Sequence, residues 1–334
     1  MTNEKARYFG IIILSLIFIL TAFFVGRAFY SKENLTTFAI FSAPKHENAG
    51  ISVYFCRDEN ISCEQKFIDV INSADKFVYC AFYNLNLDEL TNEINKKNIT
   101  IKIVIDKRNY KKLNQTVKKS TNSALMHNKF CVTDKEIITG SFNPTKDQES
   151  YDDNNIVVSN SSYLMKNYET EFYELYDDIK RNTPNTLIEL NDKTLIENYF
   201  CPEENCEEHV LLTLNKANKS IKFMTFSFTS EAIGNKLVEK NRNNVEIKGV
   251  FEKSQSIEHS QMEKLEKAGC NVTYDKNRKL MHHKIFIIDD KIVITGSYNP
   301  TANGNQNNDE NIIIIHDKDI AAQYNKEFER IVNK

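Results

Sequence analysis

The sequence lacks an excess of charge of either sign. Its 43 Lys and Arg residues face 46 Asp and Glu residues, and the formal net charge is −3. This balance excludes a protein that binds nucleic acid through a strong overall positive charge. One segment departs from the balance, because residues 102–135 hold nine Lys or Arg and two Asp, or nine minus two, +7. A solvated basic face, a phosphate-rich polymer or an anionic membrane surface would each explain this segment.

Cysteine is sparse, with seven residues in the chain, and none has the C-x2-C spacing common in zinc sites. Two pairs each flank a short polar loop between an expected strand and an expected helix. We expect one disulfide for each pair if the protein faces an oxidising compartment, while a four-cysteine zinc site and free thiols stay open as alternatives. The other three stand alone near apolar segments, which predicts small buried hydrophobic residues. The predicted disulfides are Cys56–Cys63 and Cys201–Cys206, and the single cysteines are Cys80, Cys131 and Cys270.

Charge is absent from residues 8–26, a run of 19 mostly apolar residues. A helix of this length spans the core of a bilayer, and the run is longer than the roughly 7 to 15 apolar residues of a cleaved signal peptide. We therefore expect a single-pass membrane anchor. The seven residues before it are too few for a domain, so the folded part lies wholly on its far side, which we expect to be extracytoplasmic. Basic residues flank both ends of the run and leave its orientation open.

The chain contains one pattern twice. H-x-K-x4-D at residues 127–134 is followed by GSFNPT at 140–145, and the same pattern at 282–289 is followed by GSYNPT at 296–301. The similarity extends beyond these motifs, because V-Y-F-C recurs as N-Y-F-C 145 residues later, and a Y-x3-F pair recurs after 156 residues. Each copy is therefore a domain-sized unit with few insertions, which fits about 100 to 200 residues per domain.

Each copy is expected to form a mixed β-sheet flanked by helices, since apolar strands alternate with helical segments. The predicted elements are a helix at 63–74 and strands at 77–83, 101–105, 221–228 and 245–251. The last helix of each copy carries apolar residues at helical spacing, which predicts a core face. These residues are Tyr163, Tyr168, Phe172 and Leu175 in the first copy, and Ile320, Tyr324, Phe328 and Ile331 in the second.

Turn-forming residues around Pro184 mark a linker between the copies. The predicted division is an anchor at 1–30, a stalk at 31–50, a first domain at 51–181, a linker at 182–194 and a second domain at 195–334.

The motifs supply matched polar side chains. On a strand, residues two apart share a face, so each motif histidine and lysine point the same way and His283 points the opposite way, without a role in the site. Asp134 and Asp289 lie seven residues after their histidines and are expected to form turns. The serine and asparagine after each glycine could donate hydrogen bonds to phosphate oxygens. The candidate site residues are His127, Lys129, Ser141 and Asn143, with His282, Lys284, Ser297 and Asn299.

The duplicated H-x-K-x4-D and G-S-[FY]-N patterns resemble the phospholipase D superfamily. Within it the chain is similar to a fused pair of small nuclease-type or cardiolipin hydrolase-like units. Larger members with lipid-targeting domains, and cardiolipin synthases with two membrane spans, fit the length less well. The resemblance implies two α/β domains related by a pseudo-two-fold axis, one active site between them, and no obligate protein partner.

The resemblance also assigns a third element after each Asn-Pro-Thr. Family members place a carboxylate or an amide there, which fixes the tautomer of the other half's histidine. In this chain the positions are Asn154 and Glu310. Glu310 would then face His127, and Asn154 would face His282. A carboxylate raises the basicity of an imidazole, which implies that His127 is the nucleophile and His282 the general acid and base.

The expected activity is hydrolysis of a phosphodiester through a phosphohistidine, without a metal or other cofactor. The two lysines and Asn143 and Asn299 would stabilise the five-coordinate phosphorus. The basic segment and the small unit size favour an endonuclease-like hydrolase, whereas the expected anchor favours a phospholipase D or cardiolipin hydrolase that acts on membrane phospholipids. A membrane-tethered, non-catalytic binder of phosphate ligands is the remaining alternative.

Overall fold

The computed structural model describes residues 43–57, 61–191, 193–256 and 258–334. Residues 44–334 of this range belong to one compact unit, which contains both copies of the motif. The expected membrane anchor at residues 8–26 lies outside the described residues. Among the residues that are described, no helix combines the length and the apolar character needed to cross a bilayer.

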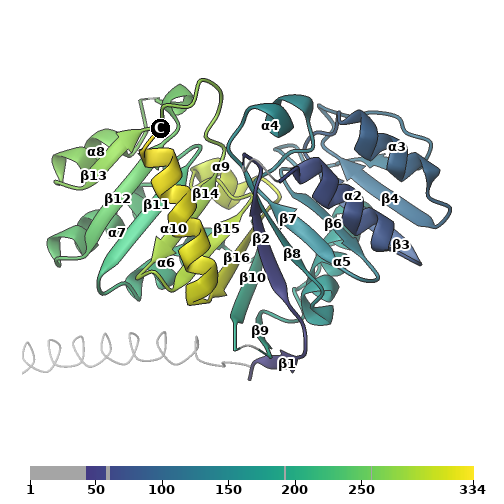
Figure 1. Ribbon diagram of the computed structural model, residues 1–334, viewed down its shortest axis with the longest axis horizontal. Coiled ribbons are helices and arrows are strands. Elements are labelled where there is room, and N and C mark those ends of the chain that lie inside the picture. The colour runs from purple at the N-terminus through teal and green to yellow at the C-terminus, as the bar shows by residue number, and fades with distance from the viewer. Residues whose placement is uncertain (1–42, 58–60, 192, 257) are drawn as a thin grey trace, which may run out of the picture. The chain divides into compact units, whose positions relative to one another are not determined.

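Each half is built on one mixed sheet, and the motif strands lie at the centre of each sheet (Figure 1). The first sheet has the order β2 (Ile51–Phe55), β8 (Asn155–Ser159), β7 (Ile137–Gly140), β6 (Lys129–Thr133), β3 (Phe77–Phe82), β4 (Thr100–Ile105) and β5 (Thr116–Lys119). The second has the order β1 (Lys45–Glu47), β9 (Leu187–Leu190), β10 (Leu195–Cys201), β16 (Glu310–His316), β15 (Ile292–Gly296), β14 (Lys284–Ile288), β11 (Ser220–Thr225), β12 (Glu246–Phe251) and β13 (Asn271–Tyr274).

Helices cover both faces of each sheet. The first half contains α2 (Cys63–Ser73), α3 (Asp88–Lys96), α4 (Lys146–Ser150) and α5 (Ser162–Asp177), and the second contains α6 (Cys206–Asn215), α7 (Glu231–Arg242), α8 (Met262–Lys267), α9 (Ala302–Gln306) and α10 (Lys318–Val332). Serine caps start three of the long helices, since Ser62, Ser161 and Ser230 each accept a backbone N–H from the first turn. The expected α/β architecture with two similar halves is confirmed.

The closing helices α5 and α10 pack where the two halves meet. Their predicted core residues lie in one hydrophobic cluster that joins both sheets, with Tyr168 and Phe172 from α5 and Tyr324 and Phe328 from α10. Each sheet also has its own hydrophobic cluster on the opposite face, between the sheet and the helices that cover that face. The site residues therefore lie at or next to the ends of strands that are held on both sides by packed helices.

Several boundaries differ from the sequence predictions. The strand predicted at 221–228 ends at Thr225, because the chain then leaves the sheet and Phe226 N–H donates to the carbonyl of His283. Parts of the expected stalk and linker are strands, since β1 and β9 pair in parallel and extend the second sheet. Neither strand stood out in the sequence, because β1 has three residues and β9 has four.

Three disulfides are present in the described residues. Two are the predicted bonds Cys56–Cys63 and Cys201–Cys206, each inside one strand-to-helix loop. The third joins Cys80 to Cys131, so both are buried as predicted, but the prediction that they stand alone was wrong. These two cysteines face each other across β3 and β6, with Cα atoms 4.1 Å apart. Cys270 is free and buried, in agreement with its prediction.

Candidate active site

The two histidine segments lie where the halves meet. Each segment pairs with the other half immediately before its strand begins, through isolated parallel bridges between Met126 and Asp309 and between Met281 and Asp153. The backbone N–H of His127 donates to the carbonyl of Asp309 at 2.9 Å. The N–H of His282 makes the equivalent bond to Asp153 at 2.8 Å. The histidines thus precede β6 and β14, whereas the sequence placed them within these strands.

His127 is held by a carboxylate of the second half. Its Nδ1 lies 2.8 Å from Oε2 of Glu310, and Tyr83 packs against its ring with centroids 5.2 Å apart. A carboxylate only accepts hydrogen bonds, so Nδ1 carries the proton and Nε2 carries the lone pair. Burial lowers the pKa of His127, and Glu310 partly opposes this shift. The neutral ring with a free Nε2 is the form that a nucleophile requires.

His282 has an amide partner instead. Its Nδ1 lies 2.9 Å from Oδ1 of Asn154 and 3.4 Å from Nε2 of Gln148, both in the first half. Burial lowers the pKa of His282 well below its usual value, and the charges of Lys284, Lys129 and His127 lower it further. In addition to burial, Lys129 and Lys284 lower the pKa of both histidines, so the four side chains influence one another electrostatically.

The two lysines are buried beside the histidines, with Lys129 fully buried and Lys284 3% exposed. Each ammonium group donates to the backbone carbonyl of the histidine two residues earlier in its own motif. Burial lowers the pKa of Lys129 to about 7 and that of Lys284 well below its usual value. Without a bound anion, the site therefore favours loss of positive charge.

The serines make contacts other than those expected. Ser141 Oγ donates to Oδ1 of Asn154 at 2.9 Å, and Ser297 Oγ donates to Oε2 of Glu310 at 2.7 Å. A hydroxyl has one proton to donate, so these serines orient the histidine partners and have none left for a phosphate oxygen. The expectation that Ser141 and Ser297 bind phosphate does not fit this geometry.

The two asparagines of the Asn-Pro-Thr segments keep unused polar atoms. Oδ1 of Asn143 and Oδ1 of Asn299 are buried without a hydrogen-bond partner. The backbone N–H of Asn143 donates to Gln148 Oε1 at 2.7 Å, which fixes this segment. Both unpartnered atoms are acceptors, so each could receive a hydrogen bond from a donor group of a ligand but not from a non-bridging phosphate oxygen.

The other motif residues lie away from the histidines. Asp134 accepts the backbone N–H groups of Asp75 and Lys76, and Asp289 accepts those of residues 218–220, so each anchors the loop before a neighbouring strand. His283 is fully buried between Asn155 and Glu327 and has a structural role. Among the described residues, no group of three or more His, Cys, Asp or Glu side chains is arranged to hold a metal ion.

Sequence reasoning missed two carboxylates that position the motifs. Asp106 Oδ2 accepts the N–H of Met126 at 2.9 Å, and Glu252 Oε2 accepts the N–H of Met281 at 2.7 Å. Both residues directly follow matched strands, β4 and β12. The internal repeat could have revealed them, because an acidic residue occurs at this place in both copies.

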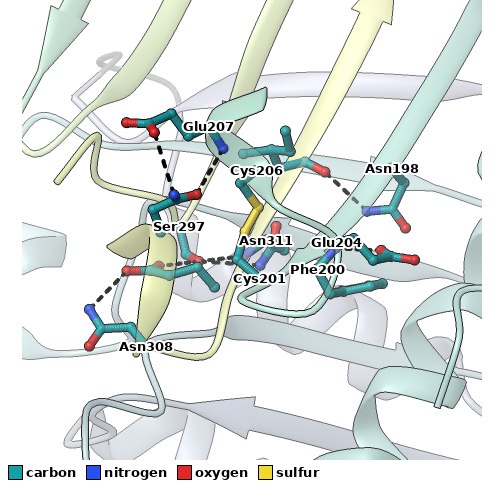
Figure 2. Close-up of a disulfide and its surroundings, with 12 residues drawn as sticks. Asn198, Phe200, Cys201, Glu204, Cys206, Glu207, Ser297, Asn308 and Asn311 are labelled. Atoms are coloured by element: carbon teal, nitrogen blue, oxygen red, sulfur yellow. Dashed lines mark hydrogen bonds between the residues drawn. A yellow bond between two sulfur atoms is a disulfide. The ribbon is translucent and has the colours of Figure 1, made fainter. Parts of the chain in front are cut away.

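Two of the three disulfides lie beside the residues that hold the histidines. In the second half, β10 pairs with β16 and sets Cys201 opposite Glu310. Figure 2 shows the Cys201–Cys206 bond together with Ser297 and Asn308. In the first half, Cys56 N–H donates to the carbonyl of Asn154 at 2.9 Å. Both bonds therefore constrain the strand next to a residue that holds a histidine.

Comparison with known sequences identifies the family. Residues 67–176 and 210–332, more than half of the chain, match the family described as cardiolipin synthase, PLD-like domain. The mitochondrial cardiolipin hydrolase of Xenopus laevis is 32% identical over 149 residues, which cover 41% of this chain and 71% of that protein. The phospholipase D of Rickettsia conorii is 30% identical over 133 residues, which cover 40% of this chain and 66% of that protein.

A solved structure shows a similar arrangement of both halves. The phosphatidylserine synthase of Haemophilus influenzae superposes with a TM-score of 0.66 over 84% of this chain and 86% of that protein, at 13% identity. At this identity the likeness concerns the fold alone. The resemblance expected from the duplicated motif is thus confirmed by a family match in each half. The chain belongs to the phospholipase D-like family of phosphodiesterases.

Proposed function

We propose that this protein hydrolyses phosphodiesters through a covalent phosphohistidine on His127. The observation that carries the proposal is the unequal pairing of the two histidines, with Glu310 beside His127 and Asn154 beside His282. A carboxylate stabilises the positive charge that a phosphorylated imidazole carries, whereas a neutral amide orients a ring without stabilising that charge as strongly.

In the first step, Nε2 of His127 attacks phosphorus and forms a P–N bond while the bond to the leaving oxygen breaks. His282 gives its Nε2 proton to that oxygen. Lys129 and Lys284 stabilise the negative charge on the non-bridging oxygens, and the amides of Asn143 and Asn299 complete the binding site. The bound phosphate anion counters the lysine charges and so favours the protonated form of His282 that this step needs.

In the second step, water attacks phosphorus and the P–N bond to His127 breaks. Neutral His282 takes the proton from water as the new P–O bond forms. The other proton of His282 stays on Nδ1 throughout both steps, where it is donated to Oδ1 of Asn154, so Nε2 alone exchanges protons with the substrate. The products are an alcohol and a phosphomonoester, and the enzyme returns to its starting protonation state.

We further propose that the preferred diester lies in a nucleic acid. Support comes from the loop after β4, which begins at Asp106 next to the first motif and carries the exposed Lys107. Tyr110 in the same loop is 39% exposed, and the ammonium of Lys119 lies 4.6 Å from its ring centroid. Cationic side chains beside an exposed aromatic ring are typical of surfaces that bind single strands.

A phospholipid substrate is the second candidate, because similar proteins are named cardiolipin hydrolase and phospholipase D. The proposed anchor at residues 8–26 would hold the site near a membrane, on its extracytoplasmic side. The test is a side-by-side assay of the purified protein on single-stranded DNA and on cardiolipin vesicles. Faster cleavage of DNA supports the first proposal, and cleavage of lipid alone supports the second. If the protein cleaves neither substrate and does not cleave bis(p-nitrophenyl) phosphate, the remaining candidate function is non-catalytic binding of phosphate ligands.

A further inference from the structure

A cavity of about 340 Å³ lies where α5 of the first half meets the second half. Its wall carries four carboxylates and one ammonium group, and that ammonium, on Lys180, already binds Glu203 at 2.7 Å. The carboxylates are Glu174, Asp178, Glu203 and Asp309. The negative charge in this cavity therefore exceeds the positive charge of its own wall.

The internal repeat supplies a matched site for comparison. Asp153 is the first-half counterpart of Asp309, 156 residues earlier, and it binds two cations of the chain itself. The guanidinium of Arg330 donates to Oδ1 of Asp153 at 2.6 Å, and the ammonium of Lys334 lies 2.8 Å from both of its carboxylate oxygens. With the same offset, the counterparts of Arg330 and Lys334 are Glu174 and Asp178.

The surroundings of the two aspartates are otherwise alike. Asn277 Nδ2 donates to Asp153 and to the carbonyl of Tyr151, while Asn122 Nδ2 donates to Asp309 and to the carbonyl of Asn307. Because these contacts match, the main difference between the two sites is that Asp153 has cationic partners and Asp309 has none among the described residues. One site is filled by side chains of the chain, and the other presents an open cavity.

The charge difference affects the buried carboxyl groups. Bonds to Lys334 and Arg330 outweigh the effect of burial and lower the pKa of Asp153. Burial raises the pKa of Asp309 to about 7, and Glu203, Glu310 and Glu174 raise it further. The first site is thus electrostatically complete, and the second lacks a positive partner.

We propose that this cavity binds an organic cation with guanidinium or primary ammonium groups, in the place that Arg330 and Lys334 occupy in the matched site. Such groups form charge-assisted hydrogen bonds with carboxylates, as both cations do with Asp153. The cavity adjoins the active site, because Asp309 directly precedes Glu310 in the chain. The backbone carbonyl of Asp309 also accepts a hydrogen bond from the backbone N–H of His127. A bound cation would hold this segment in place.

The test uses agmatine, which carries both a guanidinium and an ammonium group. Calorimetric titration of the full chain at low salt should show saturable binding, and agmatine should raise the Tm. The variant Glu174→Arg/Asp178→Lys installs the cations of the matched site, so agmatine affinity should fall at least about tenfold. Without agmatine, this variant should have a higher Tm than the wild type.

The control is Glu263→Gln, which removes one exposed carboxylate on α8, far from the cavity lining, and should bind agmatine as the wild type does. If the double variant does not fold, the single variant Asp178→Lys replaces it in the test, because Asp178 is exposed. The proposal is overturned if agmatine does not bind, if the cavity variants bind it normally, or if Mg²⁺ displaces it at equal concentration. Because binding is measured directly, the result is independent of catalytic activity.

Discussion

At the residue scale, the atoms that face Nδ1 of the two histidines give each ring a different task. Glu310 offers an oxygen that only accepts, so the proton of His127 stays on Nδ1. An amide at this position could turn its N–H toward Nδ1 and move the lone pair away from Nε2. The variant Glu310→Gln should therefore lower kcat on bis(p-nitrophenyl) phosphate by about 100-fold or more.

The matched control is Asn154→Asp, because it alters the partner of His282 without removing the acceptor. We expect its kcat to stay within about tenfold of the wild type. Equal losses in the two variants would contradict the unequal roles of the histidines. Circular dichroism would show that both variants fold.

The buried cations predict a pH dependence of anion binding. Burial lowers the pKa values of Lys129, Lys284 and His282, so the empty site loses protons as the pH rises through these lowered values. A bound anion favours the charged forms, and binding should take up protons. The affinity for sulfate should rise as the pH falls from about 8 to about 6. Calorimetry in two buffers of different ionisation enthalpy measures this uptake, and a pH-independent affinity would refute it.

At the scale of single elements, the glycine before each serine lets β7 and β15 lie close to the next strand. Gly140 has a φ of +147°, and a Cβ there would come within 2.2 Å of the carbonyl oxygen of Asn155. The variant Gly140→Ala should lose about 1 to 3 kcal/mol of unfolding free energy in urea titration. Gly50→Ala is the control, because its Cβ would meet Asn160 at an ordinary 3.9 Å. A similar stability for both variants would contradict this steric explanation.

The elements also show what the sequence could predict. Cys56–Cys63 and Cys201–Cys206 were predictable because each pair lies within one short loop. Cys80–Cys131 spans 51 residues and depends on the register of β3 against β6, which no local pattern encodes.

The candidate site was predictable to a similar extent. The repeat identified the histidines, lysines and asparagines, because each occurs at a matched position in both copies. It did not reveal that the hydroxyls of Ser141 and Ser297 donate to the histidine partners. That contact depends on how β7 and β8, and β15 and β16, lie against one another, which only the folded sheets determine.

At the scale of the whole molecule, asparagines connect the halves in both directions. Asn155 donates to Thr295 and Tyr324 of the second half. Asn311 donates to Asn128 and accepts from Tyr168 in the first half. All of these atoms are buried, so a lost partner leaves a polar group without a hydrogen bond.

The variant Asn311→Ala should therefore lower the unfolding free energy by about 1 to 3 kcal/mol, measured by urea titration. Replacing exposed Asn303 on α9 by Ala should change it by less than about 0.5 kcal/mol. If both variants matched the wild type, the proposed coupling of the halves through Asn311 would fail.

The central claim is that His127 alone carries the phosphoryl group, and acid-quenched mass spectrometry tests it most directly. The substrate is bis(p-nitrophenyl) phosphate, whose leaving group departs without a proton. His282→Ala slows the water step and should accumulate an adduct on His127, whereas His127→Ala should form none. An adduct on His282 in the His127→Ala variant would contradict the account.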